Sequence, residues 1–193
     1  MKAPSIALLA LALATGLGAQ QPAAPANPIT AAFRGRITGL SRNVVQAFDS
    51  IPESRFGYKP TPAQLTIGYI AQHVAEDNYL FCNAFGDLKA TIPDDERTTP
   101  DSVKAGWPKE KLMTQLRASF EFCGRALDQV TDASLAGETT LTYGGRSRSV
   151  SRAAMVLGHA LDLADHYSQL ANYMRLNGIL PPTALPRPAR GGE

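Results

Sequence analysis

Apolar residues recur every three or four positions in four long stretches of the chain, which is the spacing of one face of an α-helix. These stretches predict helices at residues 28–50, 66–85 and 109–132, and from a cap at Ser149 or Ser151 to Asn177. Strand-like alternation is confined to residues 134–148, where glycines flank it and either a small hairpin or an irregular excursion is expected. Four amphipathic helices with little strand pattern predict an all-α fold, a four-helix bundle.

The helix ends carry local signals of their own. Asn27 followed by Pro28 is typical of an N-cap and a first helical residue, and Thr66 is a candidate cap for the second helix. At the end of the last helix, Gly178 supplies a left-handed stop, and the two prolines after it at 181–182 forbid continuation.

The connector at residues 86–108 is long, polar and contains prolines. Loops of this length are uncommon between neighbouring antiparallel helices. A connector of about 22 residues is able to run the length of a helix of about 30 Å. We therefore expect a crossover that makes the second and third helices parallel.

The two ends of the chain differ from the middle in composition. Residues 1–19 resemble a secretory signal, with a lysine at position 2, a short apolar run and small residues at the expected cleavage site. The alternative is a membrane anchor that is not cleaved. Residues 20–27 are a linker, residues 28–180 the bundle, and residues 181–193 a Pro-rich tail expected to be disordered. The mature protein is predicted to be periplasmic or secreted, without stable membrane insertion after cleavage.

Charge narrows the range of partners. The 193 residues carry a formal net charge of +2 and contain no basic block, so no nucleic-acid partner is expected. A homodimer formed through apolar helix faces stays open as an alternative.

Two of the three candidate metal ligands lie on the last helix. Asp162 and His166 are four residues apart, so both side chains are able to reach one ion, and His73 on the second helix is a third candidate ligand. Imidazole and carboxylate together suit Zn, Ni or Fe, and three ligands leave a position open for water or substrate. The alternative is that these are ordinary polar residues at helix edges.

His159 fits this set less well. It lies seven residues before His166, about 10.5 Å along the helix axis. We interpret it as a residue that supports the ligands or lines a pocket. Tyr69, one turn before His73, is assigned the same role.

Two segments resemble the DinB-like superfamily of metal-binding four-helix bundles. One is IAQHVAEDNYLFC at residues 70–82, and the other is HYSQ at residues 166–169 followed by YMRLNGILPP at residues 173–182. The connector at residues 53–62 is also similar to the family's. The resemblance implies helices that run up, down, down and up, and it places Gln169 in the pocket region.

In that family the metal is held by one histidine of the second helix and two histidines, four residues apart, of the last helix. The matching positions are His73, Asp162 and His166, so the middle ligand is an aspartate here. Aspartate is shorter than histidine and adds a negative charge, so the site is retuned, weakened or lost.

The resemblance implies a metal-dependent enzyme that acts on an unknown small-molecule substrate. We favour a hydrolase in which Glu76 or Asp77, one turn after His73, accepts the proton of the attacking water. One alternative is a non-catalytic binding bundle that has lost its metal. Another is a thiol transferase, although an exported chain lacks obvious access to a cytosolic thiol pool.

Cys82 and Cys123 are an even pair in a chain expected to be exported. They lie at similar heights if the second and third helices are parallel, as the resemblance implies, and about 15 Å apart along the axis if these helices are antiparallel. A disulfide and two buried free thiols are both compatible with the sequence.

Overall fold

Four long helices form the body of the protein, for which a computed structural model describes residues 26–186. The long helices are α1 (Pro28–Ser50), α2 (Ile67–Phe85), α5 (Lys109–Asp128) and α7 (Arg152–Leu176). The shorter elements between and after them are η1 (Glu53–Arg55), α3 (Asp94–Thr98), α4 (Asp101–Lys104), α6 (Asp132–Leu135), the strands β1 (Glu138–Tyr143) and β2 (Arg146–Ser151), and η2 (Pro182–Ala184). The predicted all-α bundle with one small hairpin is confirmed.

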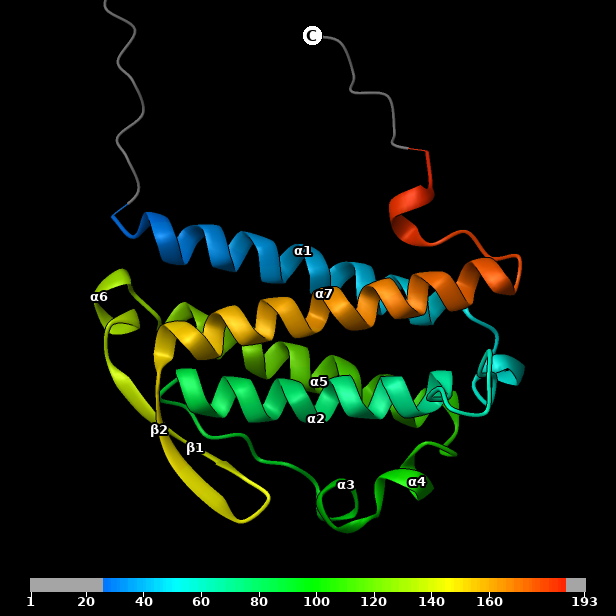
Figure 1. Ribbon diagram of the computed structural model, residues 1–193, viewed down its shortest axis with the longest axis horizontal. Coiled ribbons are helices and arrows are strands. Elements are labelled where there is room, and N and C mark those ends of the chain that lie inside the picture. The colour runs from blue at the N-terminus through cyan, green and yellow to red at the C-terminus, as the bar shows by residue number, and fades with distance from the viewer. Residues whose placement is uncertain (1–25, 187–193) are drawn as a thin grey trace, which may run out of the picture.

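The helices run up, down, down and up, as Figure 1 shows when the colours are followed from α1 to α7. Helix α2 packs most extensively against α5, which is parallel to it, and also against α7, which is antiparallel to it. The connector at residues 86–108 makes the predicted crossover and contains α3 and α4. Helix α2 therefore packs against one parallel helix, α5, and one antiparallel helix, α7.

Most helix ends follow the local signals in the sequence. The Thr66 side chain accepts a hydrogen bond from the backbone N–H of Tyr69, and the Ser151 side chain accepts one from Ala154, each at 3.1 Å. Gly178 has a φ of +71°, the left-handed conformation that ends α7.

The start of α1 is held differently from the prediction. Asn27 makes no side-chain cap; its side chain accepts instead from the backbone N–H of Asp132 at 3.0 Å. The Asp132 carboxylate accepts from the backbone N–H groups of Ile29 and Thr30, at 3.1 and 2.7 Å. A carboxylate distant in sequence thus satisfies the free donors at the N-terminus of α1.

Two predicted boundaries are corrected. The third helix ends at Asp128 instead of residue 132, because the chain turns there and starts α6, which Thr131 caps. The tail was predicted to be disordered from residue 181, but η2 is ordered. Its Thr183 hydroxyl lies 2.8 Å from the Tyr167 hydroxyl, which also accepts from the Thr183 backbone N–H at 3.1 Å. Residues 1–19, nearly all of the linker at residues 20–27, and residues 187–193 lie outside the described part.

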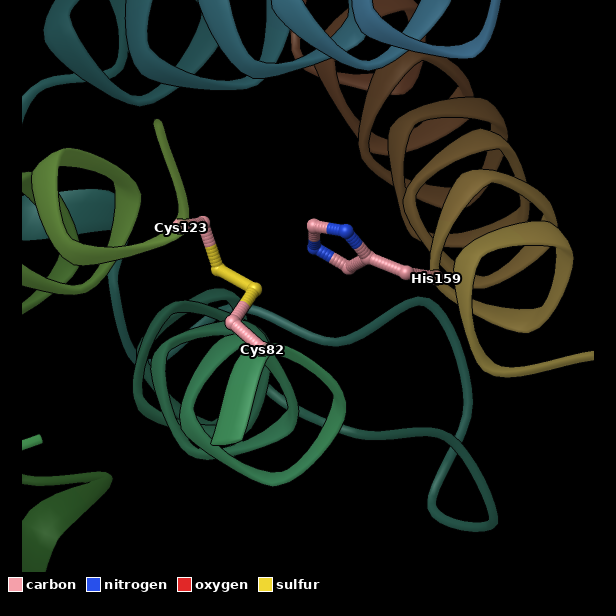
Figure 2. Close-up of side chains that lie close together, drawn as sticks. All are labelled: Cys82, Cys123 and His159. Carbon is pink, nitrogen blue, oxygen red and sulfur yellow. A yellow bond between two sulfur atoms is a disulfide. The ribbon is translucent and has the colours of Figure 1, made fainter. Parts of the chain in front are cut away.

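The structure joins Cys82 of α2 to Cys123 of α5 by a disulfide, with Cα atoms 5.3 Å apart (Figure 2). Both residues are buried. The parallel arrangement of α2 and α5 brings the two positions to the same height, which the crossover makes possible.

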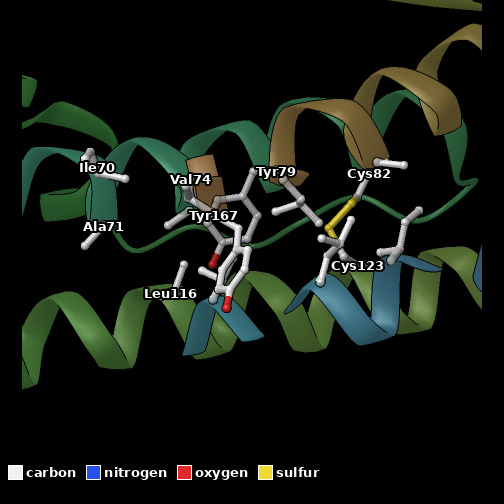
Figure 3. Packing of buried hydrophobic residues seen from close by; sticks show 14 of the residues in the cluster. Ile70, Ala71, Val74, Tyr79, Cys82, Leu116, Cys123 and Tyr167 are labelled. Atoms are coloured by element: carbon white, nitrogen blue, oxygen red, sulfur yellow. A yellow bond between two sulfur atoms is a disulfide. The ribbon is translucent and has the colours of Figure 1, made fainter. Parts of the chain in front are cut away.

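The core runs the length of the bundle and receives apolar side chains from all four long helices. Figure 3 shows the part around the disulfide, where Val74 and Tyr79 of α2, Leu116 of α5 and Tyr167 of α7 lie together. Among the described residues, no helix combines the length and apolar content needed to cross a bilayer.

Replacing both cysteines by alanine is expected to lower the free energy of unfolding by about 4 kcal/mol, because the unfolded chain regains the freedom of a long loop. The bridged residues are 41 positions apart in sequence. Guanidinium unfolding of Cys82→Ala/Cys123→Ala and of the native protein, with and without reductant, measures this. Reductant should weaken the native protein alone; equal stability of the oxidised native protein and the double variant would contradict the prediction.

Candidate metal centre

Two imidazoles and a carboxylate converge between α2 and α7. Nε2 of His73 lies 3.1 Å from Oδ2 of Asp77, and Nε2 of His166 lies 3.9 Å from the same oxygen. The two imidazole rings are perpendicular, with centroids 5.0 Å apart. One ligand atom from each of these residues lies within 4.8 Å of the other two. We call His73, Asp77 and His166 the His–Asp–His cluster.

Asp162 stands directly beside this cluster. Its Oδ1 lies 3.5 Å from Nε2 of His166, one turn later on α7. Within residues 26–186, Oδ2 of Asp162 and Nδ1 of His166 are buried without a hydrogen-bond partner. The centre therefore contains two imidazoles and two carboxylates, one of each from each helix.

The structure thus redistributes the predicted roles. His73 and His166 lie at the centre as expected, and Asp77, expected as a proton acceptor, takes the third position of the cluster. Asp162, expected as the third ligand, lies next to His166 outside the cluster. The signal for Asp77 was present in the sequence, because His73 and Asp77 have the same four-residue spacing as Asp162 and His166.

The proximity of these groups changes their affinity for protons. Burial raises the pKa of Asp77 to about 6, and the negative charge of Asp162 adds to this effect, while His73 and His166 oppose it. Burial disfavours the charged form of His166, but its interactions with Asp162, Asp77 and Gln169 together outweigh burial and raise its pKa. Two neighbouring carboxylates in a half-buried site therefore favour the presence of positive charge.

A groove of about 850 Å³ leads to the centre from the side of the β-hairpin. We call it the hairpin groove; it lies between α2, α7 and the hairpin, and Asp77 and Asp162 both line it. Leu80, Phe81 and Met155 give it an apolar wall. The side chains of Asp77 and Asp162 are 17% and 21% exposed, so both are partly accessible from solvent.

Glu76, one of the two residues predicted as a proton acceptor, is engaged in an ion pair. Glu76 pairs with Nζ of Lys104, a side chain that is only 2% exposed, and Asp101 lies 3.1 Å from the same nitrogen. Successive residues of a helix point about 100° apart, so Glu76 faces α4 while Asp77 faces α7. Glu76 attaches the crossover to α2 and does not reach the centre.

His159, which we interpreted as supporting the ligands or lining a pocket, lies inside the bundle. Its ring is fully buried between Phe81 and Phe85, at centroid distances of 5.7 and 5.9 Å, and points toward the disulfide (Figure 2). Nε2 lies 2.8 Å from Oδ1 of Asn78, whose amide donates to Ser119. Cys82 and Cys123 lie close to His159, but their sulfurs are bonded to each other and are not available as metal ligands.

The other two supporting residues lie one turn from a histidine of the cluster. The Tyr69 ring is 5.9 Å from the His73 ring, and burial is the main cause of the raised pKa of Tyr69. The Gln169 amide donates to the Tyr173 hydroxyl at 3.3 Å, one turn after His166.

Comparison with known proteins places these features in a family. A sequence model described as the DinB superfamily matches residues 36–170. No curated protein matches the chain.

Several solved structures share the fold. A DinB-like protein from Bacillus cereus is 16% identical, with a TM-score of 0.61 over 78% of this chain and 93% of that one. A DinB-like protein from Bacillus subtilis is 18% identical, with a TM-score of 0.56 over 76% of this chain and 92% of that one. A mycothiol-dependent maleylpyruvate isomerase is 14% identical, with a TM-score of 0.58 over 73% of this chain and 60% of that one. At these identities the likeness concerns the fold.

The burial of His159 predicts a loss of stability in acid. Burial lowers the pKa of His159 from 6.5 to about 4, so between these values the unfolded chain binds a proton that the folded protein excludes. The folded state therefore loses about 3 kcal/mol through this group as the pH falls from 6.5 to about 4.

Unfolding titrations across this pH range in the presence of a chelator measure the effect. His159→Gln keeps an amide near Asn78 but does not titrate, so its free energy of unfolding should fall less steeply in acid than that of the native protein. Parallel pH profiles of the two proteins would contradict the prediction.

Proposed function

The chain belongs to the DinB superfamily, and on this premise we propose that it is an enzyme that uses one divalent metal ion held by His73, Asp77 and His166. The observation that carries the proposal is the convergence of these three side chains, from two antiparallel helices, next to the hairpin groove that Asp77 lines. Zn, Ni and Fe suit this combination of imidazole and carboxylate ligands.

The spacing of the ligand atoms fits such an ion. A tetrahedral site with bonds of about 2.0–2.1 Å separates its ligand atoms by about 3.4 Å. The separations of Asp77 Oδ2 from the Nε2 atoms of His73 and His166, at 3.1 and 3.9 Å, lie on either side of that value. A divalent cation would also neutralise the two adjacent carboxylates, Asp77 and Asp162, whose proximity otherwise costs electrostatic energy.

Hydrolysis of a small molecule is the reaction that we favour. A divalent ion supplies Lewis acidity, since it polarises a substrate oxygen and lowers the pKa of water. In this proposal Asp162 accepts the proton, because it lines the groove and its Oδ2 is free of hydrogen bonds within the described residues. The apolar wall formed by Leu80, Phe81 and Met155 binds the substrate and excludes water from it.

Export is part of the proposal. The signal expected at residues 1–19 would direct the protein to an oxidising compartment, where a disulfide such as Cys82–Cys123 persists. Such a compartment favours hydrolysis over thiol transfer, which needs a reduced low-molecular-weight thiol.

Metal analysis of protein purified without a His tag tests the proposal. We expect about one ion per chain after reconstitution, with affinity reduced more than about 100-fold in Asp77→Ala and His166→Ala. Asp162→Asn should reduce affinity about 10-fold, as expected for a neighbour of a ligand. Glu76→Gln is the matched control and should bind the ion like the native protein.

Two results would contradict this assignment. A native protein that binds none of Zn, Ni and Fe after reconstitution would be a non-catalytic bundle. A stronger loss of affinity in Asp162→Asn than in Asp77→Ala would return the third ligand position to Asp162.

A further inference from the structure

The β-hairpin presents one face to the helices and the other to solvent. The strands pair so that Leu141 lies opposite Arg148 and Tyr143 opposite Arg146. Side chains of alternate residues share a face, so these four residues and Val150 lie on one side of the hairpin. Leu141 is buried in the core and Val150 packs against it, so this side faces the bundle there, whereas Tyr143 at the tip is 72% exposed.

The opposite side of the hairpin is polar and makes its own hydrogen bonds. The hydroxyls of Thr142 and Ser147 lie 2.8 Å apart, and the Ser149 hydroxyl donates to Glu138 at 2.6 Å. This division leaves the two arginines of β2 on the inner side, where both line the hairpin groove.

The side chains of Arg146 and Arg148 have no ion-pair or hydrogen-bond partner within residues 26–186, although their backbones pair with β1. In contrast, Arg117, Arg125 and Arg152 each pair with a carboxylate at 2.5–2.7 Å. Two guanidinium groups two residues apart on one face repel each other unless an anion lies between or beside them. Guanidinium groups pair especially well with carboxylate and phosphate oxygens, because their donors match the geometry of those groups.

The hairpin groove therefore combines three kinds of lining. The arginines supply positive charge from the hairpin, Leu80, Phe81 and Val150 supply apolar surface, and Asp77 and Asp162 belong to the metal centre. Its volume of about 850 Å³ suits a small molecule. Tyr143 at the tip of the hairpin lines the same groove as Asp77 and Asp162.

We propose that the substrate is a small amphipathic acid whose carboxylate or phosphate is bound by Arg146 and Arg148 while its apolar body lies along Leu80, Phe81 and Val150. This inference rests on the proposed function for its orientation, since the end of the substrate away from the arginines then reaches the metal centre. The negative charge of Asp77 and Asp162 disfavours the opposite orientation.

A matched set of probes tests the inference by calorimetry: 4-phenylbutanoate, 4-phenylbutyl phosphate, the neutral alcohol 4-phenylbutanol and the cation 4-phenylbutylammonium. The native protein should bind the two acids at least about tenfold more tightly than the alcohol, and the cation most weakly. In Arg146→Gln/Arg148→Gln the acids should bind only as tightly as the alcohol. Arg36→Gln/Arg42→Gln, which removes the same charge from α1, is the control and should behave like the native protein.

Each titration is performed on metal-loaded and on chelated protein, so that the two proposals are tested separately. The inference is supported if Arg146→Gln/Arg148→Gln, the hairpin variant, loses the preference for acids in both the metal-loaded and the chelated protein while its metal content is unchanged. This result supports the inference even if no metal-dependent activity is found. A preference for acids that needs the metal and is unaffected by the hairpin variant would overturn it, because the ion would then bind the acid. Equal binding of acid and alcohol by the native protein would also overturn it.

Discussion

Two carboxylates and two imidazoles meet where α2 packs against α7, and the rest of the site depends on this electrostatic constraint. Each helix contributes one histidine and one aspartate spaced by one turn, and the helices are antiparallel, so the two pairs face each other. The arrangement is unfavourable for two negative charges alone: burial, with the negative charge of Asp162 adding to it, raises the pKa of Asp77 to about 6. The same arrangement suits a divalent cation.

The position of α2 is set by buried attachments away from the centre. The disulfide ties α2 to α5, and the side chain of Asn78 bonds both to Ser119 of α5 and to His159 of α7. On α2 these contacts are made by Asn78, the residue directly after Asp77, and by Cys82, about one turn later. They hold the helix at a defined distance from α7, so the cluster is built on rigid elements.

The crossover and the hairpin cover the two exposed sides of α2. On one side, the buried Lys104 of α4 pairs with Glu76 and attaches the crossover. On the other, Leu141 anchors the hairpin in the core and leaves Arg146 and Arg148 over the groove. The three adjacent residues from Ala75 to Asp77 thus belong to the core, an ion pair and the candidate metal centre in turn, because helical geometry points them in different directions.

Local patterns in the sequence determined the four long helices, the caps at Thr66 and Ser151, the stop at Gly178 and the hairpin, because these depend on residues close together in the chain. The motif around His73 and His166 also identified the family. Tertiary packing alone decided that Asp77 joins the cluster, that Glu76 pairs with Lys104, that His159 is buried and that Asp132 holds α1. Those outcomes depend on the rotation of each helix about its axis and on partners far away in sequence, which periodicity does not specify.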